Sequence, residues 1–525
     1  MRRNVARILL GVALLLLITS CGSRKKGQHS GTQTSTSTST STSTEVTTGE
    51  YIPLAYSERS AMRAVWLTTI YGLDWPQTVA ATSSRMKDQR EELKRILDRL
   101  AKDKFNTVFF QVRLRGDVLY RSDIEPMSSV LTGTQQIRPN YDPLAFAIRE
   151  CRKRGLSIHA WIVTLPLGTD KQVRTLGREG VCLQRQNLCV KHNGEWYLNP
   201  ANPEARTYLA SVAAELVRKY DVDGVHLDYI RYPDHGSKFP DQKEYRLYGK
   251  GKRRAQWRTD NISQLVKEIA DSVHVNNPYA LMSAATLGRY REIPGRKSSG
   301  WTCRESVFQD PLIWFKQGSV DFIVPMMYHK DELFSPYLKD WKEVFGNRAV
   351  IPGLAAYRVT DKSKWSPSVI DRQISEIEEL GMWGVAFYRE ANIRPNVRGM
   401  APILDSHFAL PVRPLSFHKK NAPVPPQPVL VQPILRHNEI VLRWSVVGDE
   451  ALSYNIFFNI YDSKGNPMED ALLYPAVNGK ECVIPLYLFP KKSKLHFRVE
   501  AMNRLGITGR ASTPVVVNLK RHRVE

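Results

Sequence analysis

The sequence predicts a (β/α)8 barrel of the TIM type, followed by a small all-β sandwich of the immunoglobulin or fibronectin kind. Three observations lead to this fold class. Between residues 59 and 412, short apolar segments alternate with amphipathic helical segments, which is typical of a parallel sheet covered by helices. Several apolar segments end in charged and aromatic residues, as barrel strands do where they build an active site. Beyond residue 428, the pattern changes to short alternating strands.

Residues 1–21 are expected to be a lipoprotein signal peptide. Arginines at the start precede an apolar stretch at residues 8–18, which is too short to span a membrane comfortably. The stretch leads into Ile-Thr-Ser-Cys-Gly, which resembles a bacterial lipobox, so Cys21 would become the acylated N-terminus. A plain secretory signal is the alternative. The expected location is therefore the bacterial cell envelope, with the exported protein anchored by lipid on the periplasmic or the surface side.

Residues 22–58 are dominated by Ser and Thr and predict a disordered stalk, because such a segment buries too little apolar surface to fold. Six cysteines are present, and five remain after Cys21. Cys182 and Cys189 are close in sequence and are candidates for a disulfide in an oxidising compartment. No Cys or His spacing is typical of a zinc site, and neither a metal nor a cofactor is expected.

The formal net charge of +23 and the pI near 9.7 favour polyanionic partners. Anionic lipid, an acidic glycan or a cell-wall polymer fits this charge. The basic residues are spread along the chain and do not form the aromatic-interleaved motif of a nucleic-acid-binding module. We therefore expect a glycan substrate and a membrane contact through Cys21, and no nucleic acid.

The barrel segment contains eight predicted strands separated by helices. The helices are recognised by apolar residues at i, i+3, i+4 and i+7, as at Leu93, Ile96, Leu97 and Leu100. The strands are expected at residues 63–68, 106–114, 156–164, 223–233 (with a polar end), 280–286, 320–328, 349–357 and 384–388. The helices are expected at residues 86–102, 141–154, 204–220, 261–273, 311–317 and 367–380. A long loop is expected after residue 164, before the helix that begins at residue 204.

The active site is expected around the fourth strand, Asp-Gly-Val-His-Leu-Asp-Tyr-Ile-Arg-Tyr-Pro at residues 223–233. Its apolar body ends in Asp228, Tyr229 and Arg231. Other strand ends carry similar residues, and strand ends on one face of a barrel converge. These are Asp74-Trp75, Arg113 with Asp117, Trp161, Met327-Tyr328-His329, Tyr357-Arg358 and Tyr388-Arg389-Glu390. Carboxylates, arginines and aromatic rings together suit a carbohydrate, whose rings have apolar faces and hydroxyl edges.

Glycoside hydrolysis uses two carboxyl groups on opposite sides of the scissile bond. Asp228 is the first catalytic candidate, although a buried carboxylate paired with Arg231 or Arg113 would give the same pattern. Glu390 and Asp117 are candidates for the second carboxyl group, and each also fits a solvated loop. The expected substrate-binding residues are Asp74, Trp75, Arg113, Trp161, His226, Tyr229, Arg231 and Tyr328. For the histidine in this set, a hydrogen-bonded core position is the alternative.

Several short motifs resemble the glycosyl-hydrolase-like family ten. They are Arg-Ala-Val-Trp-Leu-Thr-Thr at residues 63–69, Gln-Val-Arg at 111–113, Gly-Asp-Val-Leu-Tyr at 116–120, His-Ala-Trp at 159–161, and the stretch 223–233. The resemblance covers about residues 59–412. It implies a (β/α)8 barrel and a glycoside hydrolase in an exported or lipid-anchored bacterial protein, with peptidoglycan glycan as the leading substrate. After Trp161 the chain departs from the family, because Ile162 and Val163 follow where an Asn-Pro pair is expected.

The fourth strand also resembles, at a distance, the chitinase-type motif Asp-Gly-x-Asp-x-Asp-x-Glu. Asp223, Gly224 and Asp228 match, whereas His226 replaces an aspartate and Ile230 replaces the catalytic glutamate. The acid of that clan therefore cannot be transferred to this chain. Either another carboxyl group is the acid, or the protein binds a glycan without cleaving it.

Residues 413–428 are rich in proline and predict a semi-rigid linker. Residues 429–525 resemble a fibronectin type III domain, with Trp444 and Tyr454 among the residues that carry the resemblance. Three functions remain open. They are an exported glycoside hydrolase, a non-catalytic glycan-binding lipoprotein on the same barrel, and a protein whose C-terminal domain docks a partner.

Overall fold

The computed structural model describes residues 60–519, with gaps at residues 234–235, 237, 297–299, 360–364, 396, 398, 437, 449–450, 462–467, 469 and 491–492. The predicted signal peptide with Cys21 and the whole Ser/Thr-rich region at residues 22–58 precede the described residues. None of the described helices combines the length and the apolar character that a bilayer crossing requires.

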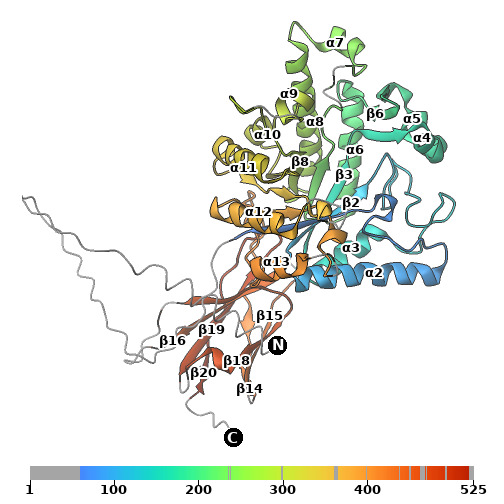
Figure 1. Ribbon diagram of the computed structural model, residues 1–525. Coiled ribbons are helices and arrows are strands. Elements are labelled where there is room, and N and C mark those ends of the chain that lie inside the picture. Colours follow the sequence, from blue (N-terminus) through green and yellow to red (C-terminus); the bar gives the residue numbers. More distant parts are fainter. Residues whose placement is uncertain are drawn as a thin grey trace, which may run out of the picture. The chain divides into compact units, whose positions relative to one another are not determined.

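Parallel strands close into an eight-position barrel, which confirms the predicted fold class (Figure 1). The strands are β1 (Met62–Leu67), β2 (Thr107–Arg113), β3 (Ser157–Val163), β7 (Gly224–Asp228), β8 (Leu281–Leu287), β9 (Phe322–Met326), β10 (Ala349–Val350) with β11 (Gly353–Leu354), and β12 (Gly384–Phe387). β12 pairs with β1, and β8 pairs with β9, so the sheet closes on itself. β10 and β11 both pair with β9. They share the seventh position, because Pro352 between them has no amide hydrogen for the ladder.

Helices follow the strands and lie on the outside of the barrel (Figure 1). They include α2 (Ser83–Lys102), α3 (Pro143–Arg152), α6 (Pro203–Lys219), α8 (Arg254–Asn276), α10 (Pro311–Lys316), α11 (Asp331–Phe345), α12 (Pro367–Glu379) and α13 (Met400–His407). The apolar stripe of α2 is buried, as its spacing predicts. α11 has no predicted counterpart, because Pro336 lies within its apolar repeat and proline usually ends or kinks a helix.

Aromatic side chains fill the inside of the barrel. Trp66, Phe109 and Phe322 are at most 1% exposed. The ring of Phe109 lies 5.4 Å from that of Trp66 and 6.2 Å from that of Phe322, between ring centres. Such layers make the barrel a packed core and not a channel. The polar residues at the strand ends therefore lie above a closed floor.

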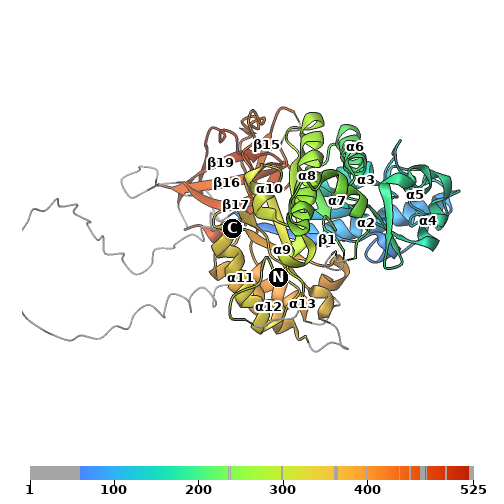
Figure 2. The same ribbon diagram turned by 90° about the horizontal axis from the view of Figure 1, so that it is seen from above.

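The segment between β3 and α6 is folded, so the prediction of a long loop there is wrong. It contains β4 (Pro166–Thr169), α4 (Asp170–Leu176), α5 (Val181–Gln184), β5 (Cys189–His192) and β6 (Glu195–Leu198). The strands form an antiparallel sheet in the order β4-β6-β5, and Figure 2 shows α4 and α5 together at one side of the barrel. Asn193 and Gly194, both at positive φ, join β5 to β6, a pair typical of a tight hairpin turn. Cys182 and Cys189 are buried free thiols.

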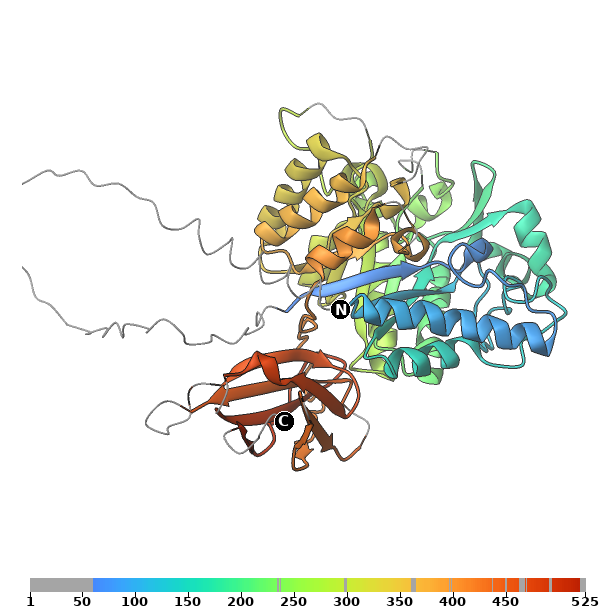
Figure 3. The ribbon, with the colours of Figure 1, turned by 60° about the horizontal axis from the view of Figure 1, so that its bottom comes forward.

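The C-terminal region folds into antiparallel sheets, consistent with the predicted sandwich (Figure 3). The strands are β13 (Val429–Leu430), β14 (Ile434–Arg436), β15 (Glu439–Ser445) and β18 (Glu481–Pro485), and β16 (Ser453–Ile460), β17 (Ala471–Val477), β19 (Lys494–Met502) and β20 (Val515–Asn518). Trp444 and Tyr454 meet edge to face in its core, with ring centres 5.2 Å apart. The assignment to the fibronectin type III family stays a prediction.

The predicted linker begins with residues that pack on the barrel. Leu415 is 5% exposed and belongs to the same apolar cluster as Phe322. Lys419 forms an ion pair with Asp321, at 2.5 Å. The first residues after position 412 are therefore held by barrel residues.

Candidate active site

Asp228 ends β7 at the C-terminal mouth of the barrel and is 5% exposed. Its Oδ2 accepts a hydrogen bond from the indole N–H of Trp161 at 3.1 Å, and its Oδ1 accepts one from the amide of Tyr229 at 2.7 Å. Burial raises the pKa of the Asp228 carboxyl, against the opposing charge of Arg231. A carboxyl group with a raised pKa is suited to donate a proton, because it keeps that proton closer to neutral pH.

The backbone of Asp228 is fixed by the end of the neighbouring strand. Thr164, which follows β3, donates its amide and its hydroxyl to the Asp228 carbonyl, at 2.9 and 2.8 Å. The Thr164 carbonyl in turn accepts a hydrogen bond from Arg113 Nη1 at 2.8 Å. Arg113 is thus connected to Asp228 through Thr164.

The Arg113 guanidinium is fully buried and bound within the protein. Its Nε and Nη2 donate to the two carboxylate oxygens of Glu125, at 2.7 and 2.6 Å, and Glu125 also accepts from the Tyr208 hydroxyl at 2.9 Å. The sequence analysis expects Arg113 to bind substrate. In the structure its donors hold β2, β3 and α6 together instead, because a buried guanidinium needs a partner for each N–H.

A wall of tyrosines faces the Asp228 carboxyl. The ring of Tyr328 lies 5.6 Å from that of Tyr357 and 5.9 Å from that of Tyr388, and the Tyr388 ring lies 6.5 Å from that of Trp161. Burial, and then the charge of Asp228, raise the pKa of Tyr388 to about 12. Burial also raises the pKa of Tyr328 well above its ordinary value. Both phenols therefore stay neutral near pH 7 and keep a hydroxyl hydrogen that a substrate could accept.

Tyr229 and Arg231 form the outer edge of this mouth. Tyr229 is 45% exposed and has a φ of 53°, a conformation that is uncommon for residues other than glycine and concentrates at functional sites. The Arg231 guanidinium lies 4.8 Å from the centre of the Tyr229 ring. Within the described residues, Arg231 Nη1 is buried without a hydrogen-bond partner. The mouth therefore offers an aromatic face and a cationic donor beside Asp228.

His226 lies one layer below Asp228, inside the barrel, and is fully buried. Its Nε2 accepts a hydrogen bond from Trp66 Nε1 at 3.1 Å, so its Nδ1 carries the proton and donates to Ser283 Oγ at 2.9 Å. The ring stacks on Phe109 at 4.1 Å. Burial holds the pKa of His226 well below its usual range. Its contacts are those of the hydrogen-bonded core histidine that was the alternative to substrate binding.

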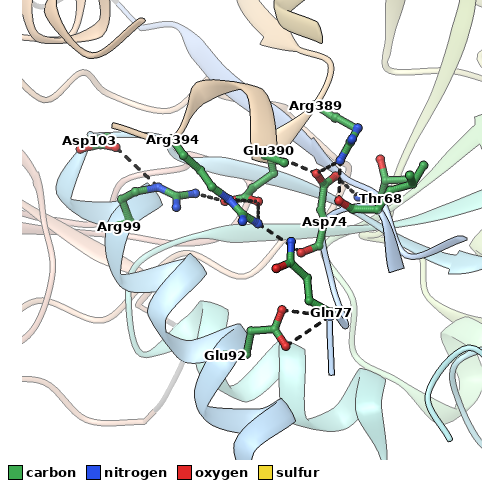
Figure 4. Close-up of polar contacts among 11 residues, drawn as sticks. Thr68, Asp74, Gln77, Glu92, Arg99, Asp103, Arg389, Glu390 and Arg394 are labelled. Atoms are coloured by element: carbon green, nitrogen blue, oxygen red, sulfur yellow. Dashed lines mark hydrogen bonds and ion pairs between the residues drawn. The ribbon is translucent and has the colours of Figure 1, made fainter. Parts of the chain in front are cut away.

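Asp74 and Trp75 are fully buried behind the mouth. The Asp74 carboxylate accepts hydrogen bonds from the Thr68 amide at 2.7 Å and from Arg389 at 2.5 Å (Figure 4). The Trp75 indole donates to the Gln89 carbonyl at 2.9 Å. These contacts connect the segment after β1 to α2 and to the segment after β12. Asp74 and Trp75 were both predicted to bind substrate. In this arrangement the polar groups of both side chains are hydrogen-bonded to other residues of the protein instead.

Glu390 belongs to a buried ion-pair cluster and is fully buried itself. Its carboxylate pairs with Arg394 at 2.6 Å and with Arg99 of α2 (Figure 4). A carboxylate that is held by two guanidinium groups is stabilised in its charged form and is a poor proton donor. Both carboxylate oxygens of Glu390 are thus used by guanidinium groups of the protein.

Asp117 lines a groove beside the mouth and accepts a hydrogen bond from the Arg115 amide at 3.0 Å. Desolvation raises the pKa of Asp117. The side chain of Arg115 pairs with Glu195 of β6 at 3.2 Å. Glu195 is a carboxylate that the sequence analysis missed, because it lies in the segment expected to be a loop. The Asn193-Gly194 pair was the available signal, since it predicts a hairpin that ends at this position.

Apart from Asp117, which lines the neighbouring groove, the predicted site residues separate into two groups. Those that meet around the mouth of the barrel are Asp228, Trp161, Tyr229, Arg231 and Tyr328. Those that are bound within the protein are Asp74, Trp75, Arg113, His226 and Glu390. In the described part of the chain, no second carboxylate is hydrogen-bonded or ion-paired to Asp228, and no group of His, Cys, Asp and Glu side chains is arranged to hold a metal ion.

Comparisons with known proteins give a consistent result. A family described as glycosyl hydrolase-like 10 matches residues 61–370. The glycosyl hydrolase YngK of Bacillus subtilis (strain 168) is 31% identical over 345 residues, which cover 62% of this chain and 67% of that protein. The glycosyl hydrolase DigH of Escherichia coli (strain K12) is 30% identical over 355 residues, which cover 62% of this chain and 81% of that protein.

Solved structures of carbohydrate-active enzymes show a weaker similarity. The glycoside hydrolase domain of PgaB (BpsB) from Bordetella bronchiseptica aligns with a TM-score of 0.43 at 15% sequence identity. The alignment covers 66% of this chain and 98% of that domain.

Proposed function

The chain belongs to the glycosyl hydrolase-like 10 family, and from this premise we propose that it cleaves glycosidic bonds of an N-acetylated or acidic glycan of the bacterial cell wall, with Asp228 as the general acid. The observation that carries the proposal is the Asp228 carboxyl itself. It is buried at the mouth of the barrel, held by Trp161, and has a raised pKa. Proton donation to a leaving oxygen requires a carboxyl group in this state.

In this proposal the group that attacks the anomeric carbon comes from the substrate. The tyrosines of the wall are unsuited to attack, because the raised pKa values of Tyr328 and Tyr388 keep them neutral. An N-acetylated sugar carries its own nucleophile, the acetamido oxygen, as in substrate-assisted glycosidases. In this step Asp228 protonates the glycosidic oxygen, the bond from that oxygen to the anomeric carbon breaks, and the acetamido oxygen bonds to the anomeric carbon. Water then gives a proton to the Asp228 carboxylate and bonds to the anomeric carbon, while the bond from that carbon to the acetamido oxygen breaks. This restores the acetamido group and the Asp228 acid.

The net charge and the mouth of the barrel agree with such a substrate. The formal charge of +23 favours a polyanionic polymer. Beside Asp228, Arg231 Nη1 is buried and has no hydrogen-bond partner among the residues that the structure describes. Tyr229, which is 45% exposed, presents an aromatic ring at the same place. Together these groups match the hydroxyl edges and the apolar faces of sugar rings.

The Asp228→Asn substitution tests the role of this residue. We expect it to lower the release of oligosaccharides from purified peptidoglycan by about a hundredfold or more, since general acid catalysis contributes about 10²–10⁴ in rate. The products are measured by chromatography, and the melting temperature shows that the variant folds. Asp271→Asn on α8, whose side chain is 59% exposed, is the matched control and should keep full activity. Full activity in Asp228→Asn would refute the assignment.

Glycan binding without cleavage is the second candidate function. It is favoured by Ile230, which occupies the position of the chitinase-type acid. An array of bacterial and host glycans separates the two functions. Specific binding, with no turnover of any bound glycan by the unmodified protein, would favour a binding protein over an enzyme.

A further inference from the structure

A groove beside the mouth of the barrel is not used by the chemistry at Asp228. Its walls come from three segments that are far apart in sequence, namely those after β1 and β2 and the helix α4 in the insertion after β3. The groove encloses about 540 Å³, within the range of sites that hold small organic ligands. It is therefore large enough to hold a ligand of its own.

Tyr71 stands at the rim of this groove and is 68% exposed. Its φ of 57° is uncommon for a residue other than glycine. Its hydroxyl nevertheless accepts a hydrogen bond from Gln172 of α4 at 2.9 Å, so the ring is held in place by a second segment of the chain. A fixed and exposed aromatic ring offers a flat apolar face to a ligand at a low cost in conformational entropy.

The other walls combine polar groups with apolar surface. Asp117 and Gln172 supply oxygen and nitrogen atoms, and Leu114 and Leu176 supply apolar surface. The Arg115 guanidinium lies 3.5 Å from Gln172 Oε1 and 3.2 Å from Glu195 Oε1. This mixture of hydrogen-bonding groups and apolar faces matches the two kinds of surface that a sugar ring presents.

The groove approaches the mouth of the barrel at Arg115. Arg115 lines the groove, and both Arg115 and its partner Glu195 act electrostatically on the phenol of Tyr229. Tyr229 directly follows Asp228 and bonds to it through its amide, at 2.7 Å. Tyr71 and Arg115 follow the ends of β1 and β2, so the groove lies on the same side of the barrel as Asp228 at the end of β7.

We propose that this groove binds further sugar units of the glycan whose bond is cleaved at Asp228, with the Tyr71 ring stacked on one sugar face and Arg115, Asp117 and Gln172 bonded to hydroxyl groups. The inference rests on the proposed function and adds to it. The preferred substrate is a polysaccharide chain that fills the groove as well as the mouth, and a disaccharide uses only part of the available contacts.

Binding of glycan fragments of increasing length tests the groove without turnover. The protein is the full chain with Asp228→Asn, and the ligands are peptidoglycan glycan fragments sorted by length and titrated by calorimetry. We expect the affinity to increase with length until the groove is filled. The additional Tyr71→Ala substitution should lower the affinity for the long fragments about tenfold. This is the effect expected for an aromatic contact worth about 1.4 kcal/mol.

Tyr487→Ala is the matched control, because Tyr487 lies in the C-terminal domain and is 65% exposed. It should leave the affinity for every fragment unchanged. Equal affinity for short and long fragments, no binding of any fragment, or the same loss in Tyr487→Ala would overturn the inference.

Turnover of short fragments by the unmodified protein, without any effect of fragment length on affinity, would leave the proposed function intact and refute only the role of the groove. Length-dependent binding that Tyr71→Ala removes, without turnover by the unmodified protein, would refute only the cleavage.

Discussion

At the scale of single residues, the environment of Asp228 decides its chemistry. Burial raises its pKa, whereas Arg231, the Tyr229 amide and the Trp161 indole favour the charged form. The balance leaves the pKa above its ordinary value, and the carboxyl group holds its proton to a higher pH than a solvated aspartate does. Since the protonated form is the proton donor, activity should fall as the pH rises through this pKa.

Trp161→Phe should move this alkaline limb of the pH profile to higher pH. The substitution removes the N–H that bonds to Asp228 Oδ2 at 3.1 Å and stabilises the carboxylate, so the pKa of Asp228 should rise further. A hydrogen bond to a charged group is worth about 1.5–3 kcal/mol, so we expect a shift of about one pH unit. The profile of kcat/KM against pH, measured beside the unmodified protein, checks this. A limb that stays in place or moves to lower pH would contradict the role given to Trp161.

At the scale of elements, the ends of β2, β3 and β7 are connected by a short chain of contacts. Glu125 holds Arg113, Arg113 bonds to the Thr164 carbonyl, and Thr164 bonds to the Asp228 carbonyl. A local pattern at residues 111–113 predicts the arginine at a strand end, but not the direction of its side chain. That direction depends on Glu125, which lies in a loop, and on Tyr208 of α6.

Arg113→Leu should lower the free energy of unfolding by about 3–5 kcal/mol, because it leaves the Glu125 carboxylate buried without its partner. Urea unfolding followed by circular dichroism measures the change. The double variant Arg113→Leu with Glu125→Leu should recover part of the loss, because it removes both charges. A single variant as stable as the unmodified protein would show that the pair does not hold these elements together.

Helices and strands were predicted correctly where the apolar repeat is regular. They were missed where a proline interrupts the repeat or where the elements are too short to show one. The stripe of α2 is continuous, and its burial follows the predicted spacing. The repeat of α11 contains Pro336, and the seventh strand is divided at Pro352. The insertion after β3 consists of elements of seven residues or fewer, too short for a clear period. Its Asn193-Gly194 turn was the strongest local signal.

At the scale of the whole molecule, the sequence before the described residues is expected to determine the location of the barrel. The charged start, the apolar stretch at residues 8–18 and Cys21 predict export and lipid anchoring. The Ser/Thr-rich stalk that follows would separate the barrel from the membrane. A cell-envelope location would bring the barrel to the polymer that the proposed function requires.

Cys21→Ala should prevent acylation and release the protein from the membrane fraction, because the thiol is the predicted attachment point of the lipid. Labelling of cells with a radioactive fatty acid, followed by fractionation, measures both effects. Ser23→Ala, two residues away, is the control and should keep the label. A labelled Cys21→Ala variant would show that the signal is not a lipobox.

The sequence by itself determined the fold class and the position of Asp228, because the alternation of strands and helices and the chemistry of a strand end are local properties of the chain. The tertiary structure decided which strand-end residues lie at the mouth of the barrel and which are bonded to other residues in the interior. Trp161 and Tyr328 lie beside Asp228, whereas Arg113 and His226 are bonded within the core. The groove at Tyr71 was also invisible in the sequence, since its walls come from separate segments that only the closed barrel brings together.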